Sequence, residues 1–172
     1  MITRFEEAVT TVLWTGYSPV APATVASALV AGILWFVPRA QSPWMLILLG
    51  LLTFVGVWLS NRYIDGYEVR DPGRFALVRR KNPKKEDPDP VVFDELVGQW
   101  ITLLAVPHTI LGFSAAFFAF RAFDIFKPLG AGQLQKLPRG WGVMLDDVLA
   151  GLWAALCLYG LHYWQPELLS AF

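Results

Sequence analysis

The chain has 172 residues, 55% of them hydrophobic, and a mean hydropathy of +0.46, so we expect a single domain, 1–172, that is more apolar than an ordinary soluble domain. The net charge is zero, which excludes the overall basic field that attracts nucleic acid. The one cysteine, Cys157, lies in an apolar run and excludes both an intrachain disulfide and a cysteine-rich zinc site.

The first predicted element is a short helix at residues 3–15, where apolar residues recur at helical spacing. Two placements are open for it. It lies in the membrane interface as an amphipathic helix, or it packs on the other helices.

Four strongly apolar regions follow, at about 23–37, 44–59, 91–123 and 148–164. The shorter ones are near the lower limit of about 17–20 residues for a spanning helix. Four such regions in so small a chain would leave a soluble domain with too little polar surface. The chain is therefore predicted to be an all-α, polytopic membrane helical bundle.

The third apolar region is too long for one ordinary span, and it contains Pro107. Proline lacks the backbone donor and disfavours helix at the residue before it. We therefore predict two helices, about 92–106 and 109–125, joined by a tight turn, with one kinked span as the alternative. This division gives about five membrane-embedded helices.

The positions of the positive charges predict the topology, because cytoplasmic loops carry excess Lys and Arg. The connection 62–90 is rich in proline and in basic residues and is predicted to be a charged, irregular cytoplasmic loop. A hairpin at 92–125 returns the basic loop 124–147 to the same side, whereas a single span would place it outside. The N-terminus is then also cytoplasmic.

Five acidic residues gather at the cytoplasmic ends of the predicted helices. Ionisable groups at membrane depth are costly and tend to be functional, and a carboxylate cluster repels itself unless a cation neutralises it. Magnesium takes oxygen ligands and bridges to phosphate oxygens, so we predict a Mg²⁺ site. The alternative is a set of solvated helix caps favoured by the helix dipole. The five are Asp94, Glu95, Asp124, Asp146 and Asp147.

Two cationic residues, Arg121 and Lys127, flank Asp124 in the sequence. Arg121 and Asp124 share a helix face at i, i+3, so Arg121 is either an intrahelical ion-pair partner or a phosphate clamp. The small and hydroxyl residues of 18–27 precede the first apolar run, where a helix start can bind an anion or simply cap the helix. His108 and His162 fall on the outer side and receive no catalytic role.

Four blocks of the sequence together resemble the phosphatidylglycerophosphatase A family. SPVAPATVAS is similar to the family's Pro-Gly-Thr-x-Gly-Ser block, although Ala23 and Ala26 stand where the family has glycine. DPDPVVFDELVGQWITL resembles its Asp-Pro and Asp-Glu-x-x-Gly block. FRAFDIFKP is similar to its Arg-x-x-Asp-x-x-Lys-Pro block, and RGWGVMLDDVLAG to its Asp-Asp block. The blocks occur in family order and cover most of residues 16–164.

The resemblance implies a magnesium-dependent phosphoric monoester hydrolase, multi-pass in the bacterial cytoplasmic (inner) membrane, with its active site facing the cytoplasm. It would convert the phospholipid phosphatidylglycerophosphate to phosphatidylglycerol and phosphate. The matching positions are Thr24, Ser27, Asp87, Asp94, Glu95, Gly98, Arg121, Asp124, Lys127, Pro128, Asp146 and Asp147.

Roles follow for these positions. The metal ligands are expected to be Asp94, Glu95, Asp146 and Asp147. Asp124 is expected to be a further ligand or to orient Arg121. The phosphate is expected to be bound by Thr24, Ser27, Arg121 and Lys127.

Two other functions are consistent with the residues. One is a phosphatase for another lipid phosphate, such as phosphatidic acid. The other is a non-enzymatic membrane scaffold or transport subunit whose acidic residues bind a cation.

Overall fold

The computed structural model describes residues 2–37, 42, 44–67, 90–128 and 130–170. Within these ranges the chain is all-helical and contains no strand, which confirms the predicted class. Most of the predicted 62–90 loop, with Asp87, lies outside the described residues. The helices are α1 (Arg4–Thr10), the 3₁₀ helix η1 (Thr15–Tyr17), α2 (Pro22–Trp35), α3 (Met45–Tyr67), α4 (Phe93–Leu103), α5 (Ile110–Phe126), α6 (Ala131–Leu134), α7 (Gly140–Trp164) and α8 (Pro166–Ser170).

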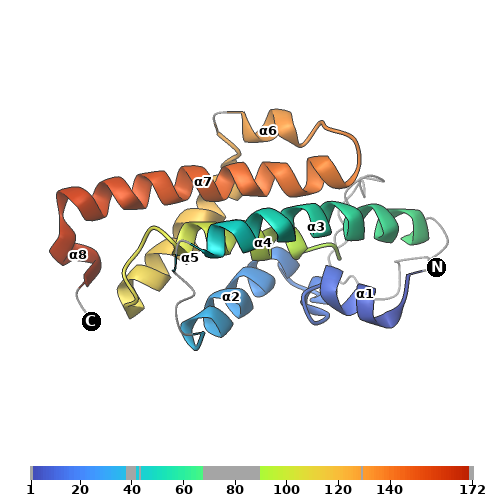
Figure 1. Ribbon diagram of the computed structural model, residues 1–172, viewed down its shortest axis with the longest axis horizontal. Helices are drawn as coiled ribbons and strands as arrows, with labels where there is room; N and C mark the ends of the chain where they lie inside the picture. Colours follow the sequence, from blue (N-terminus) through green and yellow to red (C-terminus); the bar gives the residue numbers. More distant parts are fainter. Residues whose placement is uncertain (1, 38–41, 43, 68–89, 129, 171–172) are drawn as a thin grey trace.

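The bundle is organised around α7, the longest helix (Figure 1). The helices α3, α4, α5 and α6 pack directly on α7, α8 contacts its end, and α2 packs on α4 and α5. The molecule is elongated, with α1 near one end and α8 at the other. The core is apolar and includes Val97, Leu103, Ala116 and Met144, all of which are buried.

Two described helices are long and apolar enough to cross a membrane: Met45–Asp65 in α3, and Gly140–Trp164. Two are fewer than the five membrane-embedded helices predicted. The apolar helix α2 has only 14 residues, and α4 has 11, which at 1.5 Å per residue is about 16 Å. A hydrocarbon core is about 30 Å thick, so α4 by itself is too short to span it.

The predicted break at Pro107 is confirmed, because α4 ends at Leu103 and α5 begins at Ile110. Thr109 caps α5: its hydroxyl accepts a hydrogen bond from the Gly112 N–H at 3.0 Å. The region therefore forms two helices, and the single kinked span is excluded.

The helix predicted at 3–15 is shorter in the structure and ends at Thr10. The backbone then enters the left-handed region at Val12, Leu13 and Trp14. The Thr11 hydroxyl accepts a hydrogen bond from the Trp14 N–H at 3.1 Å, and local bonds of this kind compete with helix. α1 packs on α3.

The last helix begins earlier than its apolar run. The run starts at Val148, and the sequence therefore places Asp146 and Asp147 just before the helix. In the structure α7 begins at Gly140, whose N–H donates to the Asn61 side-chain oxygen of α3 at 3.0 Å. Both aspartates consequently lie inside α7 and are buried.

Candidate metal and phosphate site

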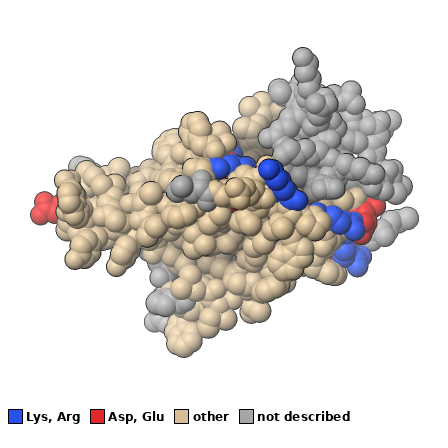
Figure 2. Space-filling model, turned by 90° about the horizontal axis from the view of Figure 1, so that it is seen from above, with Lys and Arg blue, Asp and Glu red and all other residues tan. Residues whose placement is uncertain are grey.

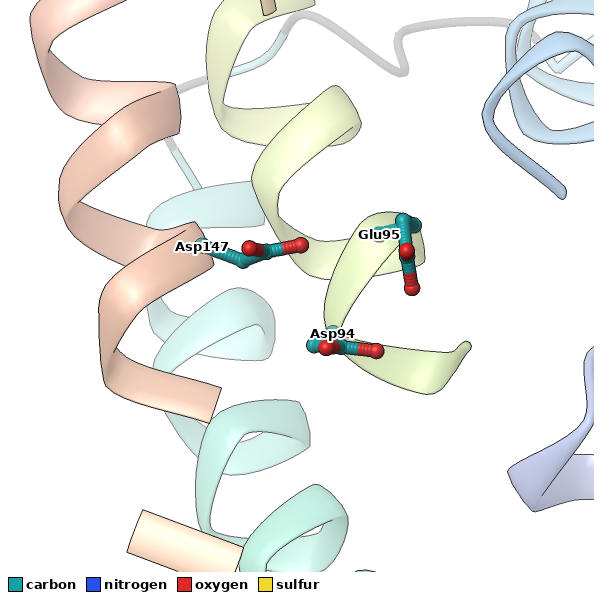
Figure 3. Close-up of side chains that lie close together, drawn as sticks. All are labelled: Asp94, Glu95 and Asp147. Atoms are coloured by element: carbon teal, nitrogen blue, oxygen red, sulfur yellow. The ribbon is translucent and has the colours of Figure 1, made fainter. Parts of the chain in front are cut away.

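Three carboxylates from two helices converge in the interior of the bundle. Asp94 and Glu95 stand in the first turn of α4, and Asp147 reaches from α7 toward α4 (Figure 3). One carboxylate oxygen from each lies within 4.8 Å of the others. Their exposed fractions are 7%, 6% and 2%, so water screens their mutual repulsion poorly.

The close approach of α4 and α7 is what brings these carboxylates together. A Cβ placed on Gly151 would lie 2.5 Å from the Gly98 carbonyl oxygen, so only glycine fits at this crossing. The Thr102 hydroxyl lies 3.0 Å from the Gly98 carbonyl oxygen and 3.2 Å from the Gly151 carbonyl oxygen. Asp94 precedes Gly98 by four residues, and Asp147 likewise precedes Gly151. Each aspartate therefore stands one turn from the crossing, on the same face.

The donor set of this cluster fits a hard divalent cation. Glu95 Oε2 and Asp147 Oδ2 are buried, and within the described part of the chain neither has a hydrogen-bond partner. Buried anionic oxygens this close together need a cation or a proton to offset their repulsion. All the side-chain donors are carboxylate oxygens, which suit hard ions better than thiolate or imidazole would. Asp94, Glu95 and Asp147 can thus hold a divalent cation.

An ion-pair network adjoins the carboxylate cluster. The Lys127 ammonium pairs with Asp146, lies 3.5 Å from Asp124 Oδ1 and 3.9 Å from Asp147 Oδ1. Arg121 Nη1 lies 2.9 Å from Asp124 Oδ2. The structure therefore brings all five predicted acidic residues into one region, but Asp146 and Asp124 face cations there.

The position of Lys127 is set by the way α5 ends. Lys127 occupies the C-cap in a left-handed conformation, with φ +44°. Burial lowers the pKa of Lys127, but the carboxylates of Asp147, Asp146 and Asp124 outweigh burial and raise that pKa above its ordinary value. The side chain is therefore positively charged at neutral pH.

Of the two alternatives predicted for Arg121, the structure contains the intrahelical ion pair. One side of its guanidinium pairs with Asp124 on the same helix. Its Nε is buried and has no hydrogen-bond acceptor among the described residues. A buried guanidinium N–H without an acceptor is suited to an oxyanion, because the planar group can bind two oxygens side by side.

The two hydroxyl residues predicted to bind phosphate lie in the first two turns of α2, which packs on α4. Ser27 is buried, and its hydroxyl donates to the Ala23 carbonyl at 2.9 Å. Thr24 is partly exposed. No described hydrogen bond joins either side chain to the acidic cluster, so their predicted role is untested by the structure.

Gln99 is a buried polar residue near the site that the sequence did not single out. Gln99 is fully buried, and neither of its amide atoms has a partner within the described ranges. It follows Glu95 by four residues and shares that face of α4. A lone glutamine in an apolar run forms no motif, so this i, i+4 spacing was the only available signal.

Together these features define an all-helical, apolar protein with a buried carboxylate centre that can hold a divalent cation, flanked by two cationic side chains that can bind an anion. The family model described as phosphatidylglycerophosphatase A matches residues 8–77 and 79–162. The chain therefore belongs to the phosphatidylglycerophosphatase A family, and it is a phosphatase.

Two relatives that carry the family's name support this assignment, and a third relative is named for a different lipid phosphatase. Phosphatidylglycerophosphatase A of Escherichia coli is 32% identical over 162 residues, which cover 90% of this chain and 83% of the relative. The Haemophilus influenzae protein of the same name is 42% identical over 77 residues, 44% of this chain and 47% of the relative. A Bacteroides thetaiotaomicron protein, provisionally named a phosphatidylinositol-3-phosphatase, is 38% identical over 152 residues, 83% of this chain and 84% of the relative. No solved structure gives a significant match.

Proposed function

We propose that the protein is a magnesium-dependent lipid phosphatase of the bacterial cytoplasmic membrane that hydrolyses phosphatidylglycerophosphate to phosphatidylglycerol and phosphate. The observation that carries the proposal is the position of a buried three-carboxylate cluster beside Lys127 and Arg121. Cation-binding oxygens and anion-binding nitrogens within one network are what hydrolysis of a phosphomonoester requires.

The carboxylates are proposed to bind the metal ion. Asp94, Glu95 and Asp147 would hold the cation, together with Asp146, the fourth of the metal ligands predicted from the sequence. When bound, Mg²⁺ supplies positive charge against the phosphate oxygens and lowers the pKa of water.

The cationic side chains act on the phosphate directly. Arg121 and Lys127 bind its non-bridging oxygens and stabilise the negative charge that builds up in the transition state. Asp124 orients Arg121 through their ion pair, and Asp146 orients Lys127. Thr24 and Ser27 are proposed as additional phosphate contacts from the start of α2.

The membrane placement follows from where charge and apolar surface lie. Figure 2 shows charged side chains over one half of the visible face and a broad uncharged surface over the other half, apart from acidic atoms at its far end. α3 and α7 cross the bilayer, α4 and α5 pack on α7, and α2 packs on α4 and α5; these three are shorter embedded helices. The distribution of basic residues supports a site on the cytoplasmic side.

A second substrate is favoured by one specific comparison. The Bacteroides thetaiotaomicron relative is named for a phosphatase of phosphatidylinositol 3-phosphate. That lipid also carries a phosphomonoester on a head group at the membrane surface. The same residues would then hydrolyse a bulkier, ring-shaped head group.

The test is phosphate release by the detergent-purified protein from three lipids: phosphatidylglycerophosphate, phosphatidylinositol 3-phosphate and phosphatidic acid. Each is assayed with Mg²⁺ and again with EDTA. Release that is fastest from phosphatidylglycerophosphate and is abolished by EDTA is the expected result. Preference for either other lipid would overturn the head-group assignment, and release that survives EDTA would overturn the role of the metal. Absence of release from all three lipids by a folded protein would contradict the proposed function.

A further inference from the structure

An apolar groove of 350 Å³ lies between α2 and α5. Its volume is in the range of about 300–1,000 Å³ typical of small-ligand sites. Among the described residues, no charged side chain lines it, and Ser114 supplies the only side-chain hydroxyl. One wall is made of small residues of α2 and the other of aromatic residues of α5: Ala28, Ala31 and Gly32 against Phe113, Phe117 and Phe118.

The groove lies on the halves of α2 and α5 that are farther from their phosphate-binding ends, and its near edge is formed by Ala28 and Phe118. On α5, Phe117 and Phe118 precede Arg121 by four and three residues, so all three share one helix face. Phe118 is six residues from Asp124, about 9 Å along the axis, and Phe113 is eleven residues away, about 16 Å. On α2, the groove residue Ala28 directly follows Ser27. The near edge of the groove is therefore within about one helical turn of Arg121 and of Ser27, and the groove runs away from the proposed head-group site along both helices.

The other end of the groove is formed by an aromatic stack. Trp35, the last residue of α2, stacks on His108 with ring centroids 4.4 Å apart. It also meets Phe113 edge-on at 5.0 Å. His108 Nε2 lies 3.0 Å from the Trp35 carbonyl oxygen. These contacts fix the ends of α2 and α5 together and give the groove a definite length.

We propose that this groove binds an acyl chain of the phospholipid substrate while the phosphate lies at Arg121. The inference rests on the proposed lipid phosphatase function and deepens it. An apolar groove whose near edge shares a helix face with the phosphate-binding arginine matches a molecule with a phosphate at one end and a hydrocarbon chain at the other. Burying the chain would position the head group, and the enzyme would thereby distinguish lipid from water-soluble phosphomonoesters.

Substitution of Gly32 by a larger residue would fill the groove. A Cβ added there meets no atom within 4 Å, so the first carbon of a new side chain has open space beside the groove. Gly50, in α3, also has nothing within 4 Å of an added Cβ and does not line the groove. Gly32→Phe and Gly50→Phe are therefore a matched pair, each also gaining helix propensity relative to glycine.

The measurement is KM for phosphatidylglycerophosphate with dipalmitoyl and with dihexanoyl chains. For Gly32→Phe we expect KM for the dipalmitoyl lipid to rise about tenfold, as expected for the loss of a few buried methylenes. The dihexanoyl lipid and kcat should change little, and Gly50→Phe should match wild type on both lipids. Gly32→Leu, a smaller filling, should give an intermediate KM. Equal KM values for Gly32→Phe and wild type on the long-chain lipid would overturn the proposal.

Two further readouts separate this inference from the proposed function. A phosphatidic acid that carries a photoreactive diazirine at its chain end should cross-link to Phe113 or Phe117, and Gly32→Phe should suppress this. The cross-linking experiment does not depend on phosphate release, so it tests the groove even if the wild-type protein is inactive. Unchanged cross-linking in Gly32→Phe overturns the groove. A change of oligomeric state in detergent on Gly32→Phe, measured by light scattering, would assign the groove to a second copy of the chain and also overturn it.

Discussion

The carboxylate of Asp147 is expected to favour metal binding but to lower the stability of the metal-free protein. Its side chain is nearly fully buried, and it is one of three carboxylates that share a small space. Without a cation, its charge is a cost that the rest of the fold must offset. With a cation, the same charge becomes a source of stability.

Asp147→Asn should therefore have opposite effects on activity and on metal-free stability. We expect phosphate release to fall by at least about a hundredfold, because one charged ligand is lost. We expect Tm in EDTA to rise, because repulsion within the cluster is relieved, and we expect the Mg²⁺-dependent increase in Tm to shrink. Thermal unfolding in detergent with and without Mg²⁺ measures both.

Glu167→Gln is the matched control for Asp147→Asn, since Glu167 is an exposed acid in α8. It should behave as wild type in activity and in both Tm values. Wild-type turnover by Asp147→Asn, or an undiminished Mg²⁺ effect on its Tm, would remove Asp147 from the metal site.

Lys127 has the complementary role, since it supplies positive charge to Asp146 and Asp124. Lys127→Met keeps the aliphatic stem but leaves these carboxylates without that cation. Loss of one partner of a buried pair costs about 3 kcal/mol, so a marked fall in the free energy of unfolding is expected, together with loss of phosphate release. Lys136→Met, at an exposed position in the same connection, should change neither. A Lys127→Met variant as stable as wild type would show that the network contributes nothing to folding.

At the scale of elements, the close crossing of α4 and α7 is what brings Asp94 and Asp147 together. Gly151→Ala should push the two helices apart, because the new methyl group would meet the Gly98 backbone. Overpacking of this kind costs about 1–3 kcal/mol. It should also weaken the Mg²⁺-dependent gain in Tm, since Asp147 would move away from Asp94.

Gly160→Ala tests the same change on the same helix where there is room for it. A Cβ at Gly160 meets no atom within 4 Å, so alanine should be neutral or slightly stabilising there through its helix propensity. If both variants lost the Mg²⁺ effect equally, the crossing would have no special role in placing the carboxylates.

Much of this arrangement could be predicted from the sequence, for identifiable reasons. The apolar runs located α2, α3, α5 and most of α7, and Pro107 located the break before α5. The family motifs named the residues that the structure gathers at the site. Local pattern was sufficient wherever a helix was continuously apolar or ended at a proline.

The rest depends on packing that no local pattern contains. Residues 140–147 mix glycine, tryptophan and aspartate, so nothing in them marked the true start of α7. Asp146 and Asp147 are neighbours in sequence but point about 100° apart on a helix. Only the packing of α7 determines that Asp147 meets α4 while Asp146 meets Lys127. The burial of Gln99 next to the site depends on the same packing.

At the scale of the whole molecule, the outer surface indicates a lipid environment. α3 is a candidate span of which only 28% is buried in the bundle, against 50% for α7. Large apolar side chains on α3 are exposed at helical spacing, among them Leu51, Phe54 and Trp58. A contiguous apolar face of this kind needs a partner in water, whereas hydrocarbon solvates it directly. The short α4 is covered by α2, α3, α5 and α7 and meets lipid little.

If α7 crosses the bilayer, the positions just before and just after it lie on opposite sides. Lys136 precedes α7, and Gln165 follows it; both are exposed. Cys157 is exposed on α7 itself, so it is first replaced by serine. In that background, a membrane-impermeant maleimide applied to intact bacterial cells should label Gln165→Cys and leave Lys136→Cys unlabelled until the membrane is opened.

This pattern would place the loop before α7 in the cytoplasm, together with Lys127 and the phosphate-binding end of α5. It agrees with the distribution of basic residues, because Lys127, Lys136 and Arg139 all precede α7. Labelling of Lys136→Cys in intact cells, with Gln165→Cys protected, would invert the orientation and place the site outside. Protection of both positions until the membrane is opened would mean that α7 does not cross, and the deep acidic site would then lie in a helix embedded from one side only.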